Sequence, residues 1–316
     1  MVLGDSGAAR TTLERVSKIL PNSSEVRRFL AQIAKRVGHL DQSIAYFEQA
    51  LALDPRHMQT LIQAAWTYTD LRQFPAALKL YDRVLDITPH DADVMATKAA
   101  IYHAQGNLPE AAGLLAGVNE QTPNDVTFLR KINHLQYERD YGEAVRLLQV
   151  RLAQFHYDVQ WEKVNDQVTL ALLQRLAGDA AGAKITAEQA RNTLEPLYKN
   201  QRDSELVLTF LPLAYALMGE KNSALNEAER AIMLKPRAKE SLDGPPYEEN
   251  LALIQTMVGE TSRAIPILTR LLQTPYTGGF LYNPTPVTPA LLRLDPIWDP
   301  LRADPAFQKL CEEKQP

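Results

Sequence analysis

Apolar residues recur along the chain at helical spacing, in paired stretches of about a dozen residues each. In the pair that precedes Pro89, the first stretch follows an i, i+3, i+4, i+7 pattern, with Leu61, Ala64, Ala65 and Tyr68. The second stretch carries its own stripe, with Ala77, Tyr81 and Val84. Each pair therefore predicts two amphipathic helices that pack against each other.

The paired stretches repeat with a constant period. Pro21, Pro55, Pro89 and Pro123 each lie 34 residues from the next. A proline at this place stops the second helix of a unit and begins the connection to the next unit. A fixed period of this length predicts a stack of helical hairpins, each of which packs on its neighbours.

The residues of one unit resemble the tetratricopeptide (TPR) pattern Trp-x2-Leu-Gly-x2-Tyr, Ala-x3-Phe, Pro. The matching positions are Leu61-x2-Ala64-Ala65-x2-Tyr68, Ala77-x3-Tyr81 and Pro89. The resemblance implies an all-α fold: a TPR-type right-handed superhelical solenoid of antiparallel hairpins. We expect about seven repeats, with regular units over 22–123 and longer, degenerate hairpins over 124–275.

Both ends of the chain depart from complete repeats. Residues 1–21 fit the second helix of an incomplete repeat, which indicates either a longer protein whose preceding part is absent or a lone capping helix. At the other end, residues 276–316 leave the repeat: the stretch from Pro275 to Pro300 is rich in Pro, Gly, Tyr and Asn, and a helix start follows at Asp304-Pro305. We expect a loop and a helix that fold back over the seventh hairpin as a cap; the alternative is a partner-binding motif.

Two segments carry a second resemblance. Residues 288–310 and 243–250 are similar to the C-terminal part of large bacterial signalling proteins, in which a TPR array follows a kinase, nucleotide-cyclase or winged-helix domain. This resemblance implies a sensory or regulatory array attached to an effector.

Composition excludes several functions. Lys and Arg number 34 against 38 Asp and Glu, which gives a net charge of −4 and argues against a nucleic-acid-binding surface. The single cysteine, Cys311, allows no internal disulfide. No apolar run reaches the roughly 20 residues of a membrane helix, and the first residues do not resemble a signal peptide. A cytoplasmic location is the default expectation, with a periplasmic one if the chain is part of a membrane-anchored regulator.

Candidate chemistry is sparse. None of the six histidines has metal-ligand spacing with another on one helix face, and we expect most of them at turns or exposed helix positions. No set of residues suggests a nucleophile, an acid–base pair or a phosphate loop. We therefore expect neither enzymatic activity nor a cofactor or metal.

The resemblance implies instead a concave groove lined by the first helix of each hairpin. By family position, the groove-facing candidates are Arg28, Gln32, Lys35, Arg36, Gln59, Ile62, Trp66, Asp70, Asp93 and His103. Trp66 either anchors a partner or packs against the adjacent hairpin. The side chains of Arg28, Lys35 and Arg36 either bind an acidic or C-terminal carboxylate group of a partner or form a solvated helix face. Some TPR domains grip the C-terminal tails of chaperones with a set of Lys, Asn and Arg side chains. The corresponding positions here hold Arg28, Gln32, Trp66, Asp93 and Thr97. Only Arg28 matches that set and Asp93 has the opposite charge, which argues against a chaperone tail as the partner.

The leading hypothesis is a non-catalytic module that binds a protein or peptide in this groove. The alternative is a small-ligand sensory domain with a closed pocket in residues 157–250. Self-association through the N-terminal half-repeat is a further possibility.

Overall fold

The computed structural model describes residues 11–12, 15–16, 18–279 and 285–313. All regular secondary structure in these ranges is helical. Seven antiparallel hairpins follow one another: α2 (Ser24–Arg36) with α3 (Leu40–Leu53), α4 (Met58–Asp70) with α5 (Phe74–Leu85), α6 (Ala92–Ala104) with α7 (Leu108–Leu114), α8 (Asp125–Tyr137) with α9 (Tyr141–Gln154), α10 (Gln160–Leu176) with α11 (Ala180–Asn200), α12 (Glu205–Met218) with α13 (Lys221–Leu234), and α14 (Pro245–Met257) with α15 (Thr261–Leu272). The fold is the all-α hairpin solenoid that the sequence predicts.

Local signals begin and end these helices. Ser23, Asp91 and Asn124 each accept a backbone N–H bond from the first turn of α2, α6 and α8, so that side chains cap three of the first helices. Pro75 and Pro109 lie in the first turn of α5 and α7, where a missing N–H costs nothing. The two helices of the fifth hairpin are longer than those of the regular units, and α11 continues through Pro196.

The small residues of the repeat lie in the core. Ala31, Ala64, Ala65 and Ala77 are almost fully buried, which lets the helices of the first two hairpins approach closely. Leu291 belongs to the same cluster although it follows the last hairpin. The core of the N-terminal hairpins is therefore completed by the far end of the chain.

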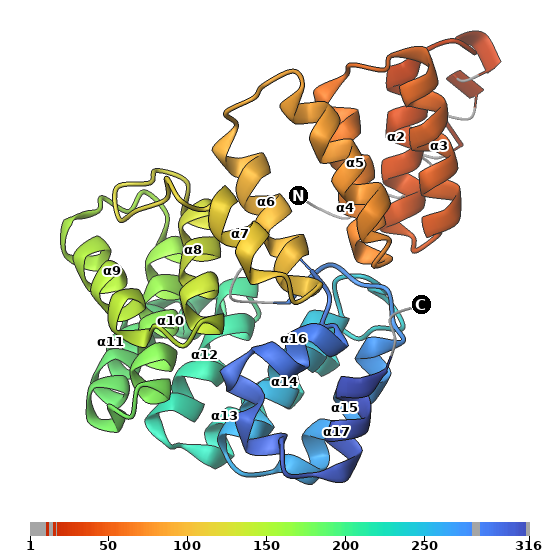
Figure 1. The fold of residues 1–316 in the computed structure, drawn as a ribbon. Helices are drawn as coiled ribbons and strands as arrows, with labels where there is room; N and C mark the ends of the chain where they lie inside the picture. The colour runs from red at the N-terminus through yellow and green to blue at the C-terminus, as the bar shows by residue number, and fades with distance from the viewer. Residues whose placement is uncertain (1–10, 13–14, 17, 280–284, 314–316) are drawn as a thin grey trace.

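After α15 the chain forms α16 (Pro289–Leu294), the 3-10 helix η1 (Pro296–Leu301) and α17 (Pro305–Glu312). We call residues 285–312 the tail. Its last helix packs on α15, but η1 packs on α14 and α16 packs on α6 of the third hairpin. Figure 1 shows the array curving so that these C-terminal helices, in blue, return beside α6. The tail thus covers the last hairpin and also crosses to the earlier ones.

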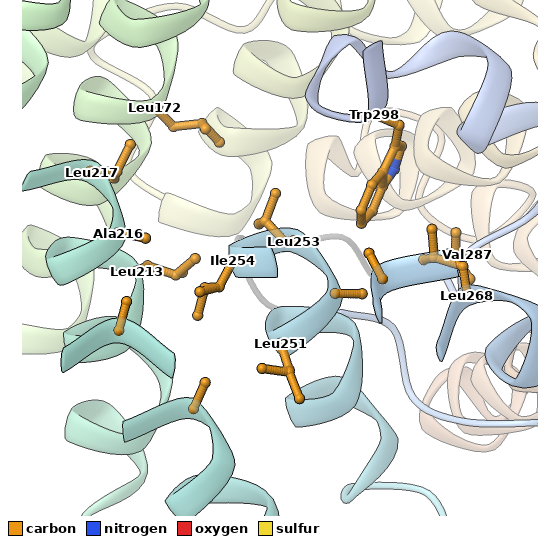
Figure 2. Close-up of a cluster of buried hydrophobic side chains, with 14 of the residues drawn as sticks. Leu172, Leu213, Ala216, Leu217, Leu251, Leu253, Ile254, Leu268, Val287 and Trp298 are labelled. Atoms are coloured by element: carbon orange, nitrogen blue, oxygen red, sulfur yellow. The ribbon is translucent and has the colours of Figure 1, made fainter. Parts of the chain in front are cut away.

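The largest apolar cluster joins the second half of the array to the tail. Figure 2 shows Leu253 and Ile254 of α14 between side chains of α12 on one side and Val287 and Trp298 of the tail on the other. Trp298 is only 3% exposed. Burial of an aromatic side chain of this size contributes about 2–3 kcal/mol, so the tail is an integral layer of the fold.

The described residues near position 21, at 11–12, 15–16 and 18–19, are helical. The rest of the expected half-repeat, residues 1–10, 13–14 and 17, lies outside the described residues.

Candidate partner-binding groove

A groove of about 300 Å³ lies beside α2 and α4. Side chains of α2 and α4 line one side of it, and residues of two connecting segments from the C-terminal half line the other side, which we call the second wall. The lining residues are Gln32, Lys35, Arg36, Phe47, Gln63, Trp66, Leu242, Asp243 and Thr277. Four of the ten predicted site residues, Gln32, Lys35, Arg36 and Trp66, thus come together in one groove.

Trp66 is the most prominent apolar group of the groove. Its side chain is 47% exposed, whereas Leu61, Ala64 and Ala65 of the same helix are buried. The apolar core stripe of α4 is therefore complete without Trp66, and about half of the Trp66 surface remains exposed. Tryptophan is enriched among the residues that contribute most to binding at protein interfaces, so an exposed tryptophan in a groove is a candidate anchor for a partner.

Polar pairs brace the two helices of the groove. The Gln32 side-chain amide donates to Gln63 Oε1 at 2.8 Å, and Lys35 Nζ lies 2.7 Å from Asp70 Oδ2. Burial raises the pKa of Asp70 to about 6 although Lys35 favours its charged form. Asp70 was expected to face a partner, but it is 3% exposed and acts by holding Lys35 in place.

Other predicted residues lie away from this groove. Arg28 is 6% exposed, with its guanidinium over the Phe29 ring and 3.6 Å from Glu25. Asp93 accepts bonds from Asn124 and Thr127 and so joins the third hairpin to the fourth. Gln59 is exposed and Ile62 is half-buried against the N-terminal core.

His103 differs most from the expectation of an exposed histidine. It is 2% exposed, and its Nε2 lies 3.1 Å from Nδ1 of His134, which is also buried. The edge of the Tyr137 ring packs against it, with ring centroids 5.0 Å apart. Burial and the neighbouring positive groups lower the pKa of His103 to about 3, so it is neutral and joins α6 to α8 instead of meeting a partner. The prediction of exposure was wrong because a histidine on a helix stripe fits a buried or a solvated position equally well.

Sequence reasoning missed the second wall of the groove. Leu242 and Asp243 precede α14, and the Thr277 hydroxyl donates to Leu242 O at 3.0 Å and lies 3.1 Å from Asp243 Oδ1. These residues lie about 200 positions from α2, so no local pattern could place them there. The resemblance of residues 243–250 to a signalling-protein motif marked the segment without indicating its position.

Further along the concave side, the tail fills the space that an open groove would occupy. A cavity of about 50 Å³ remains there, between α8, α10, α14 and η1. Two carboxyl groups line it: Asp295 accepts from Gln136 Nε2 at 2.8 Å, and Glu249 accepts from the Tyr276 hydroxyl at 2.5 Å. Burial raises the pKa of both to about 7. A volume of this size holds only a few water molecules.

Within the described ranges, no cluster of three or more His, Cys, Asp or Glu side chains is arranged to hold a metal ion. No helix among them is both long and apolar enough to cross a membrane.

The fold and the groove define a helical-repeat scaffold. Family models of the tetratricopeptide repeat match residues 29–57 and 69–129, so the chain contains tetratricopeptide repeats. The chain is similar to a tetratricopeptide repeat protein from Parabacteroides merdae in its crystal structure, with a TM-score of 0.55 and 18% identity over 80% of this chain and 93% of that one. This likeness concerns the fold alone.

Two proteins are similar in sequence to part of this chain. The general transcriptional corepressor ssn6 of Schizosaccharomyces pombe is 24% identical over 155 residues, which are 48% of this chain and 14% of that protein. Human tetratricopeptide repeat protein 7B is 24% identical over 105 residues, 33% of this chain and 12% of that protein. The matches thus span only a small part of both relatives.

Proposed function

We propose that this chain is a protein-interaction module that holds a short extended peptide segment in the groove beside α2 and α4. Tetratricopeptide repeats serve as protein-interaction scaffolds, and the observation that carries this proposal is Trp66, half exposed in a concave groove. Its indole offers a flat apolar surface for one aliphatic or aromatic side chain of the partner.

The polar lining suits the backbone and charge of such a segment. Gln32 and Gln63 present amide groups that can exchange their mutual bond for bonds to a peptide backbone. Lys35 and the exposed Arg36 stand beside them on α2. We propose that the preferred segment places an acidic side chain next to its apolar one, because Arg36 can form a bidentate bond with a carboxylate.

The groove also limits the length of the partner. Its 300 Å³ accommodate a few side chains, and the concave surface beyond it is occupied by the tail. A long helical partner that follows the whole array does not fit this arrangement.

The test is selection of peptides from a random displayed library on the full chain, followed by calorimetry with the best synthetic peptides. Trp66→Ala should weaken binding by about tenfold or more. Ile185→Ala is the matched control, because Ile185 is 58% exposed on α11, away from the groove. If Trp66→Ala and Ile185→Ala bind the selected peptides equally well, the groove is not the binding surface.

Charge is tested with a second matched pair. Arg36→Glu should weaken the selected peptides, whereas Arg56→Glu makes the same charge change at an exposed position before α4, outside the groove. An equal effect of both substitutions would show only general electrostatic attraction.

The small-ligand alternative needs a deep apolar pocket in the second half of the array. There α10, α12 and α14 pack a continuous apolar core, and the cavity beside them is small and partly polar. No specific observation favours this alternative over the peptide groove.

A further inference from the structure

Every hairpin turn of the array has one residue in the left-handed backbone region. Five of these residues are glycines: Gly38, Gly106, Gly178, Gly219 and Gly259, with φ between 77° and 88°. The other two are Arg72, with φ 58°, and Arg139, with φ 62°. A non-glycine residue in this region costs roughly 1 kcal/mol or more, so an arginine at either turn needs a compensating contact.

Both arginines make that contact with the C-terminal end of the chain. The Arg72 guanidinium donates to Leu271 O and Thr274 O, each at 2.9 Å, and to Val287 O at 3.1 and 3.2 Å. One side chain therefore binds the end of α15 and the start of the tail together, and it satisfies carbonyls that the end of a helix leaves open.

Arg139 holds the other end of the same segment. Its two terminal nitrogens lie 2.7 and 2.9 Å from the two carboxylate oxygens of Asp299 in η1, a bidentate pair. This bond lowers the pKa of Asp299, which indicates that the carboxylate is charged in the docked tail.

Two more hydrogen bonds hold the part of the tail that lies between Val287 and Asp299. The Thr288 hydroxyl donates to Ala104 O at 2.7 Å, and Gln136 donates to Asp295. Successive hairpins thus bind successive tail residues: the second hairpin binds Val287, the third binds Thr288, and the fourth binds Asp295 and Asp299. This is how a repeat array binds an extended ligand, one contact per hairpin.

The clamp by Arg72 also positions the second wall of the groove. Thr277 lies three residues after Thr274, which Arg72 binds, and it is bonded to Leu242 and Asp243. The bond to Thr274 O thus joins the turn after α4 to the segment that carries this wall. Arg72 therefore links the turn of the second hairpin to the segment that leads to Thr277.

We propose that the tail is an intramolecular ligand of the array, clamped by Arg72 and Arg139, and that this clamp sets the binding competence of the Trp66 groove. The second part rests on the proposed function. Release of the tail at Arg72 lets the wall of Leu242, Asp243 and Thr277 move away from α4, so that a bound segment loses its contacts with this wall.

Arg72→Gly tests the clamp sharply, because it removes the guanidinium and at the same time relieves the strained turn. If Arg72 had no binding role, this substitution would leave the tail unchanged and stabilise the turn. Under the proposal, amides of residues 287–301 exchange hydrogen about tenfold faster or more, and Trp298 emission shifts to longer wavelength. A background with Trp66→Phe and Trp161→Phe makes Trp298 the only tryptophan, since the chain has three.

Arg139→Gly should accelerate exchange mainly around Asp299, and the double variant should release the whole segment. Gly219→Ala is the control for a perturbed turn, because it lies at an equivalent position with open space around it and contacts no tail residue. Unchanged exchange of residues 287–301 in both arginine variants would overturn the clamp.

The effect of the Arg72 clamp on the groove is measured in the absence of a bound peptide. In a second background, with Trp161→Phe and Trp298→Phe, acrylamide quenching reports only on Trp66. Arg72→Gly should raise the quenching constant, and an unchanged constant together with a released tail would overturn the coupling. Peptide binding is measured separately, and failure to select any peptide contradicts the proposed function. Hydrogen exchange of residues 287–301 then still tests the clamp, and acrylamide quenching of Trp66 still tests its effect on the groove.

Discussion

Arg151 on α9 is completely buried, with its guanidinium between the rings of Phe128 and Phe155 at 4.4 and 3.8 Å from their centroids. It lies 3.3 Å from Asp166 and 3.7 Å from Asp125, and it donates to Thr122 O at 2.7 Å. One cation thus ties the fourth hairpin to the loop before it and to α10 after it. Arg151→Met keeps most of the apolar stem and removes the charge.

The expected loss follows from what the substitution leaves behind. Removal of one partner from a buried ion pair typically costs about 3–5 kcal/mol, because the remaining charge is uncompensated. Here Asp166 stays in the core with Asp125 close by. Burial already raises the pKa of Asp166 to about 6 with Arg151 present, and removal of the cation raises it further.

This pKa gives the pH dependence a definite sign. A carboxyl group with a folded-state pKa above its unfolded value of about 3.9 binds a proton preferentially in the folded state. Its contribution to stability is present at low pH and is lost as the pH rises through the folded-state pKa. Arg151→Met should therefore be much less harmful at pH 5 than at pH 8.

Urea denaturation followed by circular dichroism at both pH values measures the loss, and hydrogen exchange assigns it to α9 and α10, since a repeat array can unfold in segments. Adding Asp166→Asn should restore part of the stability at pH 8. An equal loss at pH 5 and pH 8, or a loss below about 1 kcal/mol at pH 8, would refute the role of the buried charge.

Three further substitutions or titrations probe other contacts. Gly38→Ala should cost clearly more than Gly219→Ala in thermal melting: both have positive φ, but a Cβ at Gly38 would lie 2.5 Å from Ser241 Oγ, so similar melting temperatures would argue against that close approach. The His103 ring should not titrate between pH 8 and pH 5 in NMR spectra, because its pKa is lowered to about 3; stability should decline as the pH falls below the unfolded value of about 6.5, and a ring that titrates near 6.5 would contradict its burial. Thr288→Val removes both the cap of α16 and the bond to the end of α6, with an expected loss of about 1–2 kcal/mol in denaturant titration; no loss would show that these bonds are dispensable.

The regular half of the fold could be predicted from local pattern alone. The 34-residue period of the prolines gave the register of the first hairpins, and the apolar stripes gave their buried faces, because each unit packs mainly on its neighbours. Gln32, Lys35, Arg36 and Trp66 were predicted from their positions in the tetratricopeptide pattern, and the structure brings these four side chains to one groove beside α2 and α4. These predictions depend only on residues a few turns apart.

The second wall of the groove and the path of the tail could not be predicted in this way. They depend on how far the array curves, which is the sum of small rotations between hairpins. One feature of the sequence nevertheless marks the place where the tail is bound. Gly38, Arg72 and Gly106 are spaced by 34 residues, so Arg72 occupies the glycine position of its turn, and such a departure indicates a contact that offsets the strained backbone.

The most direct test of the groove is the emission of Trp66 itself, in the background where it is the only tryptophan. A library-selected peptide that binds the groove should shift this emission to shorter wavelength and protect the indole from acrylamide, because the exposed face of the ring becomes covered. The same peptide with its apolar residue replaced by glycine should do neither. A peptide that binds by calorimetry without changing the emission or the quenching of Trp66 would contradict the proposed binding surface.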